Sequence, residues 1–306
     1  MNEKALKQIV DLVGNTPIVE IEHSIPNVKV LAKLEYLNPS GSIKDRAAKG
    51  MMLAAFHENI LAGKTLIEAT SGNTGIAFAM LGGALGIPVE IIMPTNATEE
   101  RKKLVANFGA KIIFTSDMEG TDGSQIKATN LVREYPEKYY YPDQYNNDQN
   151  WRAHFETTGP EIWSQSEGKV THFVAGLGTS GTFIGTAKYL QGKGVKCIAV
   201  QPNNPIHGLE GWKHMPSAQV PGIWDSSLPD QVIEADTEVG FKYAVSASRF
   251  LGLPLSPSSG ANLWAALEIA RSSKGGVVVT VFPDNSFKYL GDDFWRNNDY
   301  FAENPF

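Results

Sequence analysis

Lys44 is the first residue whose type and position suggest chemistry. It lies in the polar segment 38–46 (NPSGSIKDR), which leads directly into an amphipathic stretch at residues 45–60. The Asn-Pro and Ser-Gly pairs of this segment are typical of turns, so we predict that a helix begins close to Lys44. A lysine stabilises a helix start poorly, because that end of the helix dipole is already positive. A solvated surface lysine is the more common case, but a partly desolvated amine can form a Schiff base with a carbonyl cofactor.

A second candidate is the loop 70–75 (TSGNTG), which follows a predicted strand at 65–69 and opens a predicted helix at 74–85. The loop is rich in hydroxyl and small side chains. Free backbone N–H groups and the positive end of the helix dipole would suit a carboxylate or a phosphate there. An ordinary helix-capping loop explains the same residues, and the loop by itself leaves both interpretations open.

A third candidate is the loop 178–182 (GTSGT), between a predicted strand at 171–175 and a predicted helix at 183–190. Its two glycines allow the backbone to approach an anion closely, and its three hydroxyls add donors. It is neither a Walker A loop nor a dinucleotide fingerprint, because the required Gly-Lys-Ser/Thr sequence and glycine spacing are missing. The pattern favours a cradle for a phosphate monoester. The stretch 257–260 (PSSG) opens the predicted helix at 261–272, and taken alone it is interpreted as a simple helix cap.

Strands alternating with helices position these loops, and this pattern predicts mostly parallel sheets covered by helices on both faces. We therefore expect an α/β protein of two three-layer α/β/α domains, with ligands at the carboxyl ends of strands. Predicted strands cover residues 28–35, 65–69, 89–93, 111–114, 139–141, 171–175, 196–200 and 276–282. Predicted helices cover residues 45–60, 74–85, 99–108, 124–135, 183–190, 238–251 and 261–272.

The composition is that of an ordinary globular protein, and 306 residues can bury one large or two moderate cores. A net charge of −6 with scattered basic residues argues against nucleic acid and anionic membranes as partners. No apolar run is long enough to span a membrane. The single cysteine, Cys197, lies in an apolar run and suggests a core residue in a reducing compartment, so we expect a cytoplasmic protein. No metal site is predicted.

The three loops and the lysine segment, in this order, resemble the cysteine synthase (O-acetylserine sulfhydrylase) family of fold-type II pyridoxal-phosphate enzymes. The resemblance extends from residue 13 to residue 290 and includes the Gly-Asn-Thr-Pro sequence at residues 14–17. Ser180, at the centre of the GTSGT loop, resembles the B-type cysteine synthases, because the A-type usually has glycine there. The resemblance implies a fold like that of the tryptophan synthase β-subunit. It also implies a large cofactor-anchoring domain at 1–38 and 149–306, and a smaller mobile domain at 39–148 that binds the substrate carboxylate.

The resemblance also assigns roles to individual residues. Lys44 would hold pyridoxal 5′-phosphate as a Schiff base and move the α-proton of the substrate. Asn73 would contact the 3′-hydroxyl of the cofactor ring and Ser258 the pyridine nitrogen. The cofactor phosphate would be bound by Gly178, Thr179, Ser180, Gly181 and Thr182. The α-carboxylate of the substrate would be bound by Thr70, Ser71, Gly72, Thr74 and Gln144.

The implied reaction is a β-replacement. Sulfide or thiosulfate replaces the acetate of O-acetyl-L-serine, or the phosphate of O-phospho-L-serine, to give L-cysteine or S-sulfocysteine through an aminoacrylate. A neutral serine at the pyridine nitrogen suits this chemistry, because a weaker electron sink favours prompt loss of the β-substituent. Two alternatives are a cystathionine β-synthase-like reaction with homocysteine and a non-catalytic relative that keeps the fold. The resemblance also implies a homodimer, with an amino-acid substrate and a sulfur donor as small-molecule partners.

Three parts of the sequence leave their roles open. Lys213 and His214 could meet a phosphate leaving group or could be solvated loop residues. Gly291-Asp292 stands where the family commonly has Ser-Thr, a change that could alter substrate fit. The aromatic segment 294–306 could form a lid, a dimer contact or a frayed end.

Overall fold

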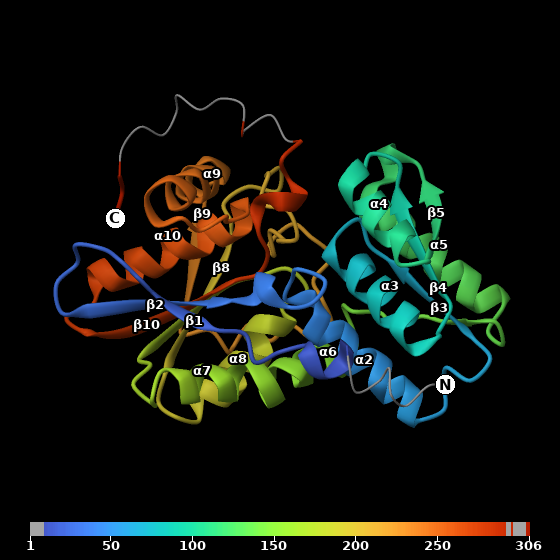
Figure 1. Cartoon of the computed structure of the whole chain (residues 1–306), viewed down its shortest axis with the longest axis horizontal. Helices are drawn as coiled ribbons and strands as arrows, with labels where there is room; N and C mark the ends of the chain where they lie inside the picture. The colour runs from blue at the N-terminus through green and yellow to red at the C-terminus, as the bar shows by residue number, and fades with distance from the viewer. Residues whose placement is uncertain (1–8, 292–294, 296–303) are drawn as a thin grey trace. The chain divides into compact units, whose positions relative to one another are not determined.

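The computed structural model describes residues 9–291, 295 and 304–306, which divide into two compact units. One unit comprises the described residues up to Gly14 together with Asn38–Asn150, and the other comprises Asn15–Leu37 and the described residues from Trp151 onward. Each unit contains one sheet (Figure 1). Asp292 and most of the aromatic C-terminal segment lie outside the described residues.

The sheet of the first unit has four parallel strands in the order β5-β4-β3-β6. These strands are β3 (Thr65–Ala69), β4 (Val89–Pro94), β5 (Lys111–Thr115) and β6 (Tyr139–Tyr140). The helices of this part of the chain are α2 (Lys44–His57), α3 (Asn73–Leu85), α4 (Glu99–Asn107) and α5 (Gly120–Glu134). Short 3₁₀ turns lie at Val10–Leu12 and Asp117–Glu119, and α6 (Asp148–Ala153) spans the change from one unit to the other.

Alternating residues of β3 face two separate apolar layers. Leu66 packs in a cluster with residues of α2 and α3, whereas Ile67 and Ala69 pack in a cluster that contains Ala128 of α5. This alternation is expected of a strand buried on both faces. The sheet is therefore the middle of three layers, and the loops after β3 and β4 leave it at the carboxyl edge.

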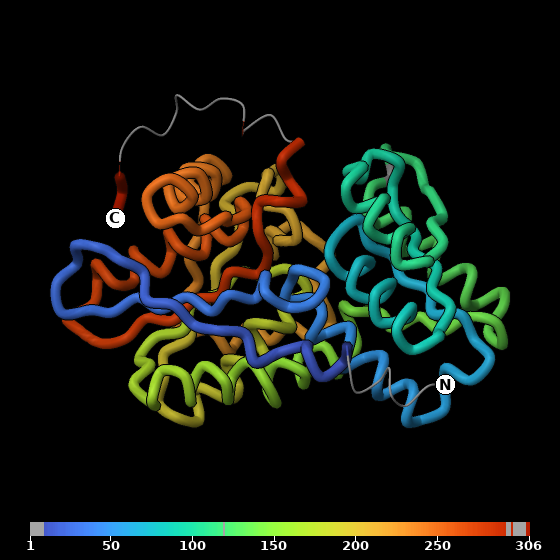
Figure 2. The backbone as a smooth tube through the Cα atoms, viewed as in Figure 1, coloured from blue at the N-terminus to red at the C-terminus, as the bar shows by residue number. Residues whose placement is uncertain are grey.

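The second unit contains a six-stranded sheet in the order β1-β2-β10-β7-β8-β9, in which only β1 runs antiparallel to its neighbour. Figure 2 shows β2 and β10, from opposite ends of the chain, lying side by side. Helices α9 and α10 cover one face of this sheet, and α7 and α8 cover the other (Figure 1). The strands are β1 (Ile18–Ile21), β2 (Val28–Leu34), β7 (His172–Gly176), β8 (Lys196–Pro202), β9 (Gln231–Ala235) and β10 (Gly276–Phe282). The helices are α7 (Gly159–Gln165), α8 (Gly181–Gln191), α9 (Thr237–Ser246) and α10 (Pro257–Ser272).

Single turns of irregular helix connect several of these elements. Turns of π-helix, which often occur near functional sites, follow α6 at His154–Thr158 and α9 at Ala247–Leu251. Turns of 3₁₀-helix lie at Glu35–Leu37 and Ser286–Lys288. The sequence predicted one continuous α-helix at 238–251, but the structure has α-helix only to Ser246 and a π-helical turn after it.

The expected α/β architecture with mostly parallel sheets is confirmed, but several element boundaries were wrong. The edge strands β1 and β9 were not predicted, because they are short and carry exposed residues. Helix α10 begins at Pro257 and not at Ala261, since Ser256 is the N-cap and Pro257 fits the first turn. None of the helices in the described ranges is both apolar enough and long enough to cross a membrane.

Candidate active site

Lys44 is the first residue of α2, as the turn residues before it predict, and it is partly buried. The carboxylate of Asp45 accepts hydrogen bonds from both the backbone N–H (2.7 Å) and the hydroxyl of Ser40. The backbone N–H of Lys44 donates to Ser42 Oγ at 3.3 Å. These contacts fold the loop back onto the helix start and fix the backbone that carries Lys44.

The TSGNTG loop joins β3 to α3 in the same unit. Gly72 occupies the N-cap position, and its N–H donates to Thr70 Oγ1 at 3.2 Å. The Thr74 hydroxyl donates to Gln144 Oε1 at 2.8 Å, and Asn150 Nδ2 donates to the Gln144 carbonyl at 2.6 Å. Gln144 therefore lies against the start of α3, although 70 residues separate it from Thr74. The structure brings together the residues predicted to bind a carboxylate.

The amide of Gln144 is oriented by these contacts. Its Oε1 is used as an acceptor by Thr74, so the Nε2 end is the one that can donate to an anion. The first turn of α3 adds backbone N–H groups that have no acceptor within the helix. Side-chain amide, hydroxyl and backbone donors thus converge where a carboxylate would bind.

In the second unit, the GTSGT loop joins β7 to α8, and α8 begins at Gly181. Ser180 adopts the left-handed conformation (φ 69°) at the N-cap. A Cβ at Gly178 would lie 2.1 Å from the carbonyl oxygen of Gly211, so only glycine fits this position. Thr179 and Ser180 are buried, and the Ser180 hydroxyl donates to the Thr179 carbonyl at 2.5 Å. The hydroxyls of the two threonines and the N-terminus of an 11-residue helix are the other donors of this loop. This donor set suits a phosphate.

Ser258 lies in the first turn of α10 and is buried. Its hydroxyl is 3.2 Å from that of the N-cap Ser256, and Ser259 donates to the carbonyl of Asp284 at 2.7 Å. Asp284 follows β10, which is the neighbour of β7 in the sheet. Because parallel strands end at the same edge, Ser258 and the GTSGT loop lie at one edge of this sheet.

His154 was not predicted, yet it contacts the GTSGT loop. The imidazole is buried, with Nδ1 2.9 Å from Thr158 Oγ1 and Nε2 3.3 Å from Thr182 Oγ1. His154 lies in the π-turn that packs on α8 at Gly185. The packing there is close, because a Cβ atom on residue 185 would lie only 2.0 Å from the carbonyl oxygen of Trp151. No local motif marks this histidine, because its role follows only from the packing of that turn on α8.

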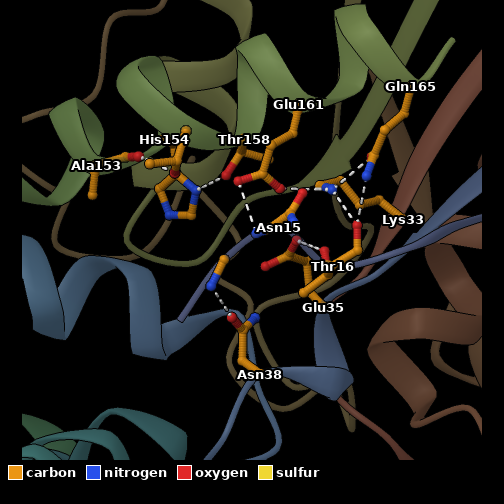
Figure 3. Close-up of polar contacts among 12 residues, drawn as sticks. Asn15, Thr16, Lys33, Glu35, Asn38, Ala153, His154, Thr158, Glu161 and Gln165 are labelled. Carbon is orange, nitrogen blue, oxygen red and sulfur yellow. Dashed lines mark hydrogen bonds and ion pairs between the residues drawn. The ribbon is translucent and has the colours of Figure 1, made fainter. Parts of the chain in front are cut away.

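A buried ionic network lies beside this turn (Figure 3). Lys33 of β2 is fully buried, and its Nζ lies 2.8 Å from each of three oxygens: Thr16 O, Gln165 Oε1 and Glu161 Oε2. Glu161 also accepts the N–H of Asn15 at 3.0 Å. The network joins the Gly-Asn-Thr-Pro segment to α7, which follows the π-turn directly. In the same unit, burial raises the pKa of the Cys197 thiol to about 12, in keeping with its prediction as a core residue.

Comparisons with known proteins place this chain in a family. Residues 9–284 match the family described as "Pyridoxal-phosphate dependent enzyme". The cysteine synthase of Aquifex aeolicus is 48% identical over 308 residues, covering 97% of this chain and 94% of that protein. The chain belongs to the cysteine synthase family of pyridoxal-phosphate-dependent enzymes. Cysteine synthase B of Pseudomonas aeruginosa is 39% identical over 289 residues, covering 92% of this chain and 95% of that protein.

A solved structure extends the comparison to the fold. The cysteine synthase of Entamoeba histolytica superposes with a TM-score of 0.90 at 33% identity, covering 94% of this chain and 90% of that one. The predicted family, the fold-type II architecture, the enzyme class and the pyridoxal-phosphate cofactor are therefore confirmed. The roles predicted for individual residues remain predictions, and they are developed below.

Proposed function

We propose that this cysteine synthase makes L-cysteine from O-acetyl-L-serine and sulfide, with pyridoxal 5′-phosphate attached through Lys44. The observation that carries the proposal is that hydroxyl-rich loops open both α3 and α8, while Lys44 opens α2. Two such helix starts suit two anions, the substrate carboxylate and the cofactor phosphate. When bound, the cofactor supplies an electrophilic carbon and an electron sink for reactions at the α- and β-carbons of amino acids.

Lys44 has two tasks in this proposal. Its Nζ amine attaches the cofactor, and once displaced by the amino group of the substrate it removes the α-proton and later returns it. The Asp45–Ser40 contacts support this role, because they hold the backbone of the helix start while the long side chain moves.

The first unit supplies the groups that recognise the α-carboxylate. Thr70 and Ser71 would present hydroxyl donors, and Gln144 would add its Nε2 amide. Gly72 and Thr74 would line the same loop, with the Gly72 N–H and the Thr74 hydroxyl orienting Thr70 and Gln144. The Thr74–Gln144 hydrogen bond supports this assignment, because it leaves the amide N–H₂ end to face an anion. The segment 39–148 is proposed as the smaller, mobile domain that closes on the substrate and excludes water from the reaction.

Most of the groups that would hold the cofactor belong to the second unit, which lies within the proposed large domain formed by 1–38 and 149–306. The phosphate would be bound by Gly178, Thr179, Ser180, Gly181 and Thr182. Ser258 would contact the pyridine nitrogen, and Asn73, from the first unit, the ring 3′-hydroxyl. Two features support the phosphate assignment. The backbone of residue 211 packs so closely on residue 178 that only glycine fits there, and the loop carries hydroxyl groups. A neutral serine at the ring nitrogen suits elimination of acetate, because it does not favour protonation of that nitrogen.

A homodimer in the cytoplasm completes the proposal. The homodimer is supported by the family resemblance. The cytoplasmic location is supported by the only cysteine in the sequence, which is buried and fits a reducing compartment. Sedimentation of the purified enzyme tests the dimer, which would give twice the mass of one chain.

The proposed reaction is tested by supplying purified enzyme with O-acetyl-L-serine and sulfide and measuring L-cysteine. The matched control is Lys44→Ala, which should bind the cofactor weakly and make no cysteine, whereas Lys49→Ala, on the same helix, should remain active. Parallel reactions with O-phospho-L-serine, thiosulfate and homocysteine define the leaving group and the nucleophile. Cofactor-loaded wild-type enzyme that makes cysteine from neither serine ester would contradict the proposal.

A further inference from the structure

Glu68 is a fully buried carboxyl group that the proposed reaction does not use. It lies on β3, two residues before Thr70, with a relative exposure of 0%. Its Oε1 accepts the N–H of Ala69 at 3.0 Å. Its Oε2 has no hydrogen-bond partner within the described part of the chain. A buried oxygen in this state would be costly if it carried a negative charge.

The ionisable groups around Glu68 are acids. The negative charge of Asp143, in the turn after β6, raises the pKa of Glu68. A charge on Glu68 would likewise raise the pKa values of three tyrosines, Tyr140, Tyr141 and Tyr145. The negative charge of Asp122, on α5, also raises the pKa of Tyr145. Burial is the largest effect on the pKa of Glu68 and raises it, and the charge of Asp143 raises it further. The backbone N–H groups of Ala69 and Gln144 offset only part of this increase. The carboxyl group therefore keeps its proton well above the usual pH range of a glutamate.

Glu68 is also joined to the proposed carboxylate site by short connections. Alternation along β3 places it on the same face as Thr70, at the strand end from which the TSGNTG loop leaves. In the turn after β6, Asp143 is followed directly by Gln144, whose side chain accepts the hydroxyl of Thr74. Glu68 is thus linked to the proposed carboxylate site along β3 itself, through the end of the strand, which Thr70 follows directly.

We propose that Glu68 is a positioning residue that must be protonated when the α-carboxylate of the substrate binds to the TSGNTG loop and Gln144. The proposal rests on the function proposed above, since it needs that loop to bind the carboxylate. Two negative charges repel each other strongly where water is excluded, so an ionised Glu68 would oppose the binding of the substrate carboxylate. Binding of the substrate and ionisation of Glu68 therefore exclude each other.

The test uses Glu68→Gln, which has the same shape and is neutral at every pH. The matched control is Glu58→Gln, since Glu58 is an exposed glutamate of the same unit. Infrared spectroscopy of the cofactor-loaded enzyme reports the carbonyl stretch of a protonated carboxylic acid. The dissociation constant for O-acetyl-L-serine is measured across pH from the change that it produces in the visible spectrum of the cofactor.

We expect the infrared band in the wild type and in E58Q at neutral pH, and its loss in E68Q. Above the pH at which the band disappears, O-acetylserine binding should weaken by about tenfold per pH unit in the wild type and E58Q, but not in E68Q. The chemical step, measured at saturating substrate, should change little. A structural role alone would alter stability without this difference in pH dependence.

Three results would overturn the proposal for Glu68. They are the absence of the band from the wild type at neutral pH, a band that persists at every pH at which the enzyme stays folded, and a pH dependence of binding that E68Q shares with the wild type. A wild-type spectrum that does not respond to O-acetylserine at any pH is a separate result. It contradicts the proposed function itself and removes the site on which Glu68 would act.

Discussion

The buried Lys33–Glu161 pair offers a quantitative prediction about stability (Figure 3). Lys33 has a side-chain exposure of 0%, whereas Glu161 retains 17%. In Glu161→Gln, the buried ammonium of Lys33 loses the carboxylate that lies 2.8 Å from it, and we expect a cost of about 3–5 kcal/mol. In Lys33→Met, the carboxylate left behind can be hydrated at the surface, and we expect a smaller cost of about 1–3 kcal/mol. The two substitutions should therefore lower the free energy of unfolding by different amounts, and Glu161→Gln should lower it more than Lys33→Met.

Urea unfolding of the single variants and of K33M/E161Q measures these differences and the coupling between the two sites. The double variant should cost less than the sum of the single ones, because the Lys33–Glu161 attraction can be lost only once. The control is the exposed pair Lys29–Glu20 at 3.0 Å, with side-chain exposures of 61% and 55%. Glu20→Gln should change stability by no more than about 1 kcal/mol. A cost for E161Q as small as that of E20Q, or one below that of K33M, would refute the reasoning.

Three further predictions concern the site. Replacing His154 with Ala removes the contact with the Thr182 hydroxyl, worth about 1 kcal/mol, and should weaken pyridoxal-phosphate binding about fivefold in equilibrium dialysis. Replacing Thr74 with Val frees the Gln144 amide and should raise the KM for O-acetylserine about tenfold with a nearly unchanged kcat, whereas a purely structural effect would lower both the thermal stability and kcat. Because the pKa of Glu68 is raised in the folded state, its contribution to stability is complete below about pH 4.5 and is lost as pH rises towards the folded pKa. Relative to E68Q, the wild type should therefore lose up to about 1.4 kcal/mol per pH unit in that window, and parallel stability curves would contradict this sign.

Much of the fold could be predicted from the sequence, since buried parallel strands leave a strong local pattern. β3 and β10 were predicted with the bounds that the structure has, because both are short runs rich in apolar and β-branched residues, with turn or polar residues on either side. β1 and β9 were missed because edge strands carry exposed residues and lack that pattern. The start of α10 was placed too late because Pro257 and the serines after it are typical of a loop as well as of a first helical turn.

The site shows the same division between local and long-range information. The loops could be predicted because their turn residues and hydroxyls lie together in the sequence. The Thr74–Gln144 contact was anticipated only through the family resemblance, since no spacing rule joins residues 70 positions apart. His154 and Glu68 could not be found, because their importance depends on burial and on neighbours that only the folded chain provides.

The central claim is that Lys44 carries the cofactor and its chemistry. The most direct test is the visible spectrum of the purified enzyme, recorded before and after addition of O-acetyl-L-serine, together with that of Lys44→Ala. We predict that the wild type shows the visible band of lysine-bound pyridoxal phosphate, and that O-acetylserine shifts the band and sulfide restores it with release of L-cysteine. A K44A protein whose band, shift and cysteine yield match those of the wild type would contradict the account.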